Sequence, residues 1–260
     1  MRTEAYWIVL AALLPACNAT SSRFAVGGAS ASVVTASGDI RAAVDQYRAM
    51  LGPDNGNGPG AHPTGRREIN WDKVPDEKAA PNFLPGDFFN GSAAPRARGA
   101  LLSTPGTGLQ ASASATNAAK TPVAFGHVNA SYSKAFPRFS EERLFSPIGS
   151  NVVDLEFRVP GTDTKALVRG FGAVYCDVDT THTAFEYFDA EGRSLGKYAV
   201  PIADAGLSFL GVAFEQPIVA RVRIEYGTVA LGPDDSPAND VAVMDDFIYG
   251  EPQAAKSTCP

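Results

Sequence analysis

The chain has 260 residues, a formal net charge of −6 at pH 7 and a sequence pI near 5.1. Hydrophobic residues make up 45% and charged residues 19% of it, which provides enough apolar material for a sizeable core and excludes a chain that is disordered throughout. Lysine and arginine form no clustered stripe, so we expect no nucleic acid partner, and we expect the basic pair Arg66-Arg67 to lie solvated before a strand.

The N-terminus predicts export. Residues 5–16 form an apolar run that is too short to span a bilayer, which requires about 20 residues. We therefore expect a signal peptide or lipoprotein signal over residues 1–19. The run ends in the sequence LPAC, which resembles a bacterial lipobox whose cysteine, Cys17, would be lipidated and would anchor the protein to a membrane. Conventional cleavage close to that point is the alternative, and both interpretations predict a secreted or cell-envelope protein, in the periplasm or at the outer membrane.

Residues 20–66 predict a tether that carries one short helix. The stretch 18–38 is rich in Ala, Ser and Gly without a sustained period, which is typical of a flexible segment. Apolar residues recur at helical spacing over residues 39–51, so we expect a helix that packs on the outside of the domain or forms a loosely held arm. Residues 52–65 contain five Gly and three Pro, which predicts a linker or a long loop.

Residues 67–252 predict a single all-β domain, followed by a tail at 253–260. Apolar and polar residues alternate along 151–159 and 218–226, as expected of half-buried strands. Several further runs with this spacing, separated by turn sequences, predict a jelly-roll-like antiparallel β-sandwich. The segments LVRGFGAVY and LSFLGVAF are apolar on both faces and should lie centrally.

Several segments also carry a resemblance. The stretches GRREINWDKVPD, RLFSPIGSNVVDLEFRVPGT and VAVMDDFIYGEPQ, with others between residues 39 and 253, resemble a family of uncharacterised exported bacterial proteins. That resemblance implies export and a β-sandwich and implies no activity. More distantly, Trp71-Asp72 and Asp245-Asp246 look like the terminal strands of MAM-type and carbohydrate-binding extracellular modules. In such modules these acids often hold a structural calcium.

The first predicted candidate site is a structural Ca²⁺ site formed by Asp72, Asp245 and Asp246. The first and last strands of a jelly roll commonly pair, which would bring these carboxylates together, and converging oxygens are the ligands that Ca²⁺ requires. The alternative is that the acids occupy strand ends and turns and accept backbone N–H bonds. A second acidic pair, Asp177 and Asp179, lies on one face of a strand end, where it would either line a ligand site or stay solvated.

Aromatic residues are the signal for carbohydrate binding, because sugar rings stack on flat apolar faces. The candidates are Trp71, Tyr132, Phe136, Phe139 and Phe145, and the alternative is that these rings seal the end of the sandwich. Cys176 and Cys259 form a disulfide in one interpretation, which would fix the tail to a strand. In the other, Cys176 is a small buried residue and Cys259 is a free thiol.

The sequence therefore predicts an exported non-catalytic module that binds carbohydrate or another cell-surface component, with Ca²⁺ as a structural cofactor. Two alternatives stay open. One is a structural or adhesive envelope protein that acts through protein contacts, and the other is a carbohydrate-active enzyme, since two carboxylates across a cleft are all that glycoside hydrolysis requires. No zinc-protease motif, hydrolase elbow or phosphate-binding loop occurs in the sequence, so no catalytic residue is predicted.

Overall fold

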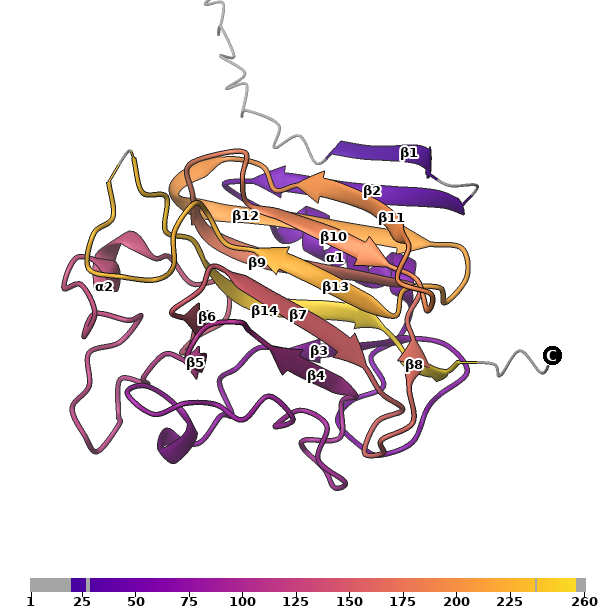
Figure 1. The fold of residues 1–260 in the computed structure, drawn as a ribbon, viewed down its shortest axis with the longest axis horizontal. Coiled ribbons are helices and arrows are strands. Elements are labelled where there is room, and N and C mark those ends of the chain that lie inside the picture. Colours follow the sequence, from indigo (N-terminus) through magenta and orange to yellow (C-terminus); the bar gives the residue numbers. More distant parts are fainter. Residues whose placement is uncertain (1–19, 27–28, 237, 256–260) are drawn as a thin grey trace, which may run out of the picture.

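The alternating segments form two antiparallel β-sheets packed face to face (Figure 1). The computed structural model describes residues 20–26, 29–236 and 238–255. This arrangement confirms the all-β sandwich that the sequence predicts. The larger sheet contains, in spatial order, β1 (Thr20–Val26), β2 (Ala29–Ser37), β12 (Ala203–Phe214), β9 (Gly170–Val178), β14 (Val243–Gly250), β6 (Phe145–Ile148) and β5 (Gly108–Ala111), with β3 (Arg66–Ile69) also paired to β14.

The second sheet has five strands and covers one face of the first. Its order is β11 (Ser194–Ala199), β10 (Ala184–Phe188), β13 (Arg221–Glu225), β7 (Val152–Phe157) and β4 (Ala100–Ser103). A separate two-stranded pair joins β8 (Ala166–Leu167) to β15 (Gln253–Ala254). Among the described residues, the helical elements are α1 (Arg41–Leu51), the 3-10 helix η1 (Asp76–Lys78) and α2 (Tyr132–Ala135).

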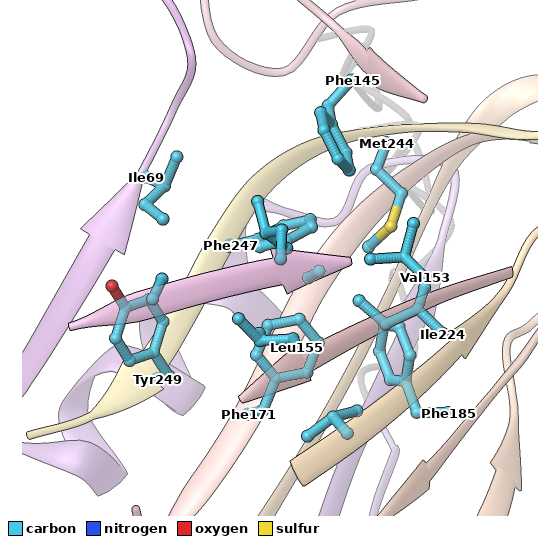
Figure 2. Close-up of a cluster of buried hydrophobic side chains, with 14 of the residues drawn as sticks. Ile69, Phe145, Val153, Leu155, Phe171, Phe185, Ile224, Met244, Phe247 and Tyr249 are labelled. Atoms are coloured by element: carbon cyan, nitrogen blue, oxygen red, sulfur yellow. The ribbon is translucent and has the colours of Figure 1, made fainter. Parts of the chain in front are cut away.

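The main core lies between the two sheets. In β7 every second side chain is buried, as the alternation predicts, and the same holds for β13. Together with Phe185 of the neighbouring strand β10, these side chains meet those of β9 and β14 from the larger sheet. Figure 2 shows Leu155 and Ile224 close to Phe171 and Phe247. Burying a side chain of this size contributes roughly 1.5–3 kcal/mol, so this layer is the main source of the domain's stability.

Helix α1 covers the outer face of the larger sheet, which explains why β9 and the second half of β12 are buried on both faces. Val44 and Tyr47 of the helix pack there with Val174 of β9 and Phe209 of β12. The helix and the central position of both strands are as the sequence predicts. Because the helix packs on the sheet, it is not a loosely held arm.

Tyr47 approaches the sheet closely because glycines lie beneath it. Its hydroxyl donates a hydrogen bond to the backbone oxygen of Val212 at 2.9 Å. A Cβ atom at Gly211 would lie 2.6 Å from a ring carbon of Tyr47, and one at Gly172 would lie 2.8 Å from another. Any larger residue at these two positions would therefore push the helix away from the sheet.

The expectation of a flexible tether over residues 20–38 is wrong, because this segment forms strands β1 and β2. Strand β2 pairs with β1 on one side and with β12 on the other. Val33 faces the core between the sheets, whereas Val34 and Ala36 face helix α1. Burial on both faces removes the two-residue alternation, so small apolar residues and serines here imitate a low-complexity linker.

The expected linker at residues 52–65 is a long loop folded back onto the domain, the second of the two alternatives. It surrounds Arg67, which is fully buried and not solvated as the sequence suggested. The Arg67 guanidinium donates to the carboxylate of Glu251 at 2.8 and 2.9 Å. It also donates to the backbone oxygens of Gly58 at 2.6 Å and Gly60 at 2.9 Å. A single cation thus organises a segment that has little apolar material of its own.

Candidate functional site

The pairing of the first and last core strands occurs as predicted, because β3 pairs antiparallel with β14 and places Ile69 opposite Phe247. Just beyond this pairing, Trp71 donates its ring N–H to the backbone oxygen of Asp245 at 2.7 Å. The ends of the two strands therefore lie together, and with them Asp72 and Asp245.

The carboxylates of these acids are occupied by N–H and O–H donors. Asp72 accepts the backbone N–H groups of Glu142 and Arg143, both at 3.0 Å. Asp245 accepts the N–H of Phe139 at 2.7 Å and both the N–H and the hydroxyl of Ser140, at 3.2 and 2.7 Å. Their common function is to hold the segment 139–143 against the strand ends, which favours the alternative that strand-end acids accept backbone N–H bonds.

Asp246, the third predicted calcium ligand, lies near an arginine of helix α1. Its side chain lies 3.5 Å from the Arg48 guanidinium, which binds Glu68 more closely at 2.7 Å. Burial and the adjacent Asp245 carboxylate raise the pKa of Asp246 to about 8. The first predicted site is thus a set of internal hydrogen bonds beside one buried acid whose pKa is raised.

Of the aromatic candidates, Trp71, Tyr132, Phe136 and Phe145 are buried and Phe139 is half-buried. Trp71 is 1% exposed and stacks on Phe145 with ring centroids 4.1 Å apart. Tyr132 is 0% and Phe136 3% exposed; their rings stack on each other, and the Tyr132 hydroxyl donates to Gly232. A ring buried on both sides has no face open to a sugar, so the arrangement favours the alternative that these residues seal one end of the sandwich.

The second acidic pair, Asp177 and Asp179, belongs to a larger acidic pocket at one end of the larger sheet. One carboxylate oxygen each from Asp177, Asp179 and Asp204 lies within 4.8 Å of the other two. They line a pocket of about 460 Å³ together with Asp235 and Thr180. The three acids could hold a metal ion, and we call them the acidic triad.

A bulge in strand β12 assembles the triad. Ala203 pairs with Val178 and Leu207 pairs with Cys176, so residues 204–206 bulge out opposite Asp177. The bulge places Asp204 beside the end of β9 and directs the Ala205 N–H to Asp177 at 2.7 Å. Bulges are common next to functional sites because they re-aim side chains at the end of a sheet.

The loop after β9 is fixed by a further acid that does not line the pocket. Asp240, 2% exposed, accepts the N–H of Thr180 at 3.0 Å and its hydroxyl at 2.6 Å. The oxygens of the Asp240 carboxylate thus accept hydrogen bonds from the loop, as those of Asp72 and Asp245 accept hydrogen bonds from the segment 139–143. Asp179, in contrast, has one buried carboxylate oxygen to which the described residues donate no hydrogen bond.

The charges of the pocket act on one another. Burial raises the pKa of Asp177 to about 7, and the carboxylates of Asp179, Asp235 and Asp204 add to this rise. Burial and nearby carboxylates also raise the pKa values of Asp179 and Asp235. Converging carboxylates repel unless a proton or a cation lies between them, so the pocket is suited to a hard, oxygen-binding cation.

Sequence reasoning identified Asp177 and Asp179 and missed Asp204 and Asp235. The two-residue spacing of the first pair is visible in the sequence, because alternate residues of a strand share a face. Asp204 comes from a bulge and Asp235 from the loop before β14. The sequence around each residue contains no pattern that predicts its place in the pocket.

Cys176 is fully buried in β9. Its predicted partner Cys259 lies outside the described residues, as do Cys17 and the export signal at 1–19. The disulfide, the lipid anchor and the signal therefore stay predictions.

Within the described residues, no helix combines the length and apolar character needed to cross a membrane. Comparison of the chain with protein-family models, curated proteins and solved structures found no match.

Proposed function

We propose that this protein is an exported β-sandwich module that binds Ca²⁺ at the acidic triad and uses the ion to bind carbohydrate or another cell-surface component. The observation that carries the proposal is the convergence of three carboxylate oxygens within 4.8 Å at the edge of an open pocket. This proposal assigns the ion to Asp177, Asp179 and Asp204, whereas the sequence-based hypothesis assigned it to Asp72, Asp245 and Asp246.

The donor set favours Ca²⁺ over the other common protein metals. All three side chains of the triad supply carboxylate oxygens, whereas Zn²⁺ is usually bound by histidine and cysteine. Mg²⁺ demands near-ideal octahedral geometry and releases its water reluctantly, whereas Ca²⁺ accepts irregular sets of six to eight oxygens. A triad built from a strand end and a bulge supplies oxygens in an irregular arrangement.

The pocket leaves room for a ligand on the ion. Three carboxylates fill only part of the coordination sphere of Ca²⁺, and the pocket of about 460 Å³ is far larger than the ion. Neighbouring hydroxyl groups of a sugar are hard oxygen donors of the kind that Ca²⁺ prefers. Because the neighbouring aromatic rings are buried, binding would depend on the ion and on polar contacts instead of ring stacking.

Thermal unfolding of the purified protein with CaCl₂ and with EDTA tests the ion. A ligand at about 100 times its dissociation constant stabilises the folded state by about 2.7 kcal/mol, which corresponds to an increase in Tm of about 5–10 °C for a domain of this size. The increase should disappear in Asp179→Asn and Asp204→Asn. It should persist in Asp163→Asn, a control at an exposed position in the loop after β7.

Glycan-array binding in the presence and absence of Ca²⁺ tests the second half of the proposal. Binding that requires Ca²⁺ and is lost in Asp204→Asn supports it. Ca²⁺ binding without any glycan signal would restrict the ion to a structural function. A Tm that is equal in CaCl₂ and EDTA would contradict the proposal as a whole.

A further inference from the structure

Three arginines are buried in the described part of the chain, and they differ in how their charge is compensated. Arg67 is bound by Glu251 at 2.8 Å, and Arg143 is bound by Asp76 at 2.6 Å. Arg98 is 5% exposed, but no carboxylate of the described residues forms a salt bridge with it. The Nε–H of Arg98 also has no hydrogen-bond acceptor within that part of the chain.

Two hydrogen bonds of its backbone hold Arg98 in place. Its N–H donates to the backbone oxygen of Phe89 at 2.9 Å, and its own oxygen accepts the Tyr249 hydroxyl at 3.0 Å. Tyr249 belongs to the central strand β14, so the arginine is attached to the rigid part of the sandwich. The side chain of Arg98 therefore enters the pocket from a fixed point of the fold.

The Arg98 side chain lines a small pocket of about 20 Å³, formed by residues that follow β3 and residues that precede β4. Two further cations, Lys73 and Arg96, line the same pocket, and its apolar walls are Trp71, Phe88 and Phe89. The pocket has no lining residue in common with the acidic pocket. A cavity of this volume has room for a water molecule or for one small polar group.

The surroundings of Arg98 compensate its charge only in part. The guanidinium lies over the Phe89 ring at 5.0 Å, a contact that contributes roughly 0.5–2 kcal/mol. Burial lowers the pKa of Arg98, and the distant attraction of Asp54 is opposed by the like charge of Arg67. Leaving a buried cation without a partner costs several kcal/mol, so an anion bound to Arg98 would stabilise the fold.

We propose that Arg98 is the base of an anion-binding site that takes the carboxylate group of a small organic acid or of an acidic sugar. The planar guanidinium presents parallel N–H donors that match the two oxygens of a carboxylate. The pocket is small, at about 20 Å³, which favours a compact anionic group such as a carboxylate. Lys73 and Arg96 at the rim would draw the anion in and would hold any further negative charge of the ligand.

The experiment is a titration of the purified protein with sodium acetate, sodium galacturonate, sodium phosphate and sodium chloride at constant ionic strength. The readout is the ¹⁵N–¹H resonance of the Arg98 side chain, together with Tm. We expect acetate or galacturonate to shift this resonance in a saturable manner and to raise Tm. A response to acetate alone would assign the site to free small acids, and a response to galacturonate as well would include acidic sugars.

Arg98→Gln should raise the dissociation constant of the responding carboxylate by about tenfold or more, the loss expected for charged hydrogen bonds. If this variant does not fold, Lys73→Gln and Arg96→Gln keep the proposal testable, because both residues are exposed and each should weaken binding without changing Tm in chloride. Arg193→Gln is the control. The Arg193 side chain is 74% exposed, and its replacement should change neither the dissociation constant of the carboxylate nor Tm.

The proposal would be overturned if no carboxylate shifted the Arg98 resonance. It would equally be overturned if chloride or phosphate produced the same shift as acetate, since the site would then have no preference for the carboxylate group. None of these outcomes depends on Ca²⁺. The experiments can therefore contradict the anion-site proposal and support the calcium proposal, or contradict the calcium proposal and support the anion site.

Discussion

Two groups of aspartates lie at strand ends of the same larger sheet, and they have different chemical consequences. Asp72 and Asp245, near the β3–β14 pairing, accept N–H groups from the segment 139–143. Asp177 and Asp179, with Asp204, face an open pocket, where the described residues offer little besides the Ala205 N–H. Both groups look alike in the sequence. What distinguishes them is whether the rest of the chain supplies donors for their oxygens.

This difference predicts opposite effects of removing a carboxylate. At the β3–β14 end an aspartate stabilises the fold, because it satisfies backbone donors that would otherwise be buried without partners. At the acidic triad an aspartate without a cation repels its neighbours and destabilises the fold. Substitutions at the two ends can therefore support or refute the comparison.

The largest effect is expected for Asp245→Ala. This variant loses three hydrogen bonds to Phe139 and Ser140 and leaves two backbone N–H groups without an acceptor. We expect the free energy of unfolding to fall by about 3–4 kcal/mol, measured by urea denaturation. Asp163→Ala should change it by less than about 0.5 kcal/mol. A loss below about 1 kcal/mol for Asp245→Ala would show that the acid does not hold the segment.

A smaller effect, dependent on pH, is expected for Asp246→Asn. The pKa of Asp246 is about 8 in the folded protein and near 4 when unfolded, so the folded state retains a proton that the unfolded state releases. The Asp246 contribution to stability therefore falls as pH rises from about 4 to 8. Asparagine does not titrate, so the stability of the variant relative to the wild type should increase across this window, by at most about 1.4 kcal/mol per pH unit.

Urea denaturation of both proteins at pH 4.5, 6 and 8 measures this difference. A difference that stays constant between pH 4.5 and 8 would mean that Asp246 is already ionised in the folded protein. In that case Arg48, which lies 3.5 Å from the Asp246 carboxylate, would compensate its charge.

The smallest effect is expected for Asp179→Asn in EDTA. Removing one of the converging charges should leave the free energy of unfolding unchanged or raise it by about 0.5 kcal/mol, since the residue is partly exposed and its interactions are screened. The sign is the informative part, because it is opposite to that of Asp245→Ala. A clear loss of stability in EDTA would place Asp179 among the aspartates with a structural function.

The sequence predicted the fold where only one face of a strand is buried. Strands β7 and β13 keep a strict alternation because their outer faces are solvated. Strand β2 was missed because α1 covers its outer face, so Val33 and Val34 are both buried and the pattern is lost. Arg67 was misjudged for a related reason: its partner Glu251 is distant in the sequence, and only the folded chain brings the two together.

The candidate site was predictable only in part, for geometrical reasons. Spacing along one strand indicates that Asp177 and Asp179 lie close together, but it does not reveal which distant segment folds against them. Asp204 reaches them through the bulge in β12, and Asp240 fixes the adjoining loop from the segment before β14. Conversely, the β3–β14 pairing was predicted correctly, and the donors of segment 139–143 that occupy Asp72 and Asp245 were not.

Isothermal titration calorimetry with CaCl₂ at pH 7.5 tests the central claim most directly. We predict one Ca²⁺ per chain in the wild type and in Asp72→Asn, and loss of binding in Asp204→Asn. Absence of binding in the wild type would contradict the account, and so would binding that survives in Asp204→Asn but is lost in Asp72→Asn.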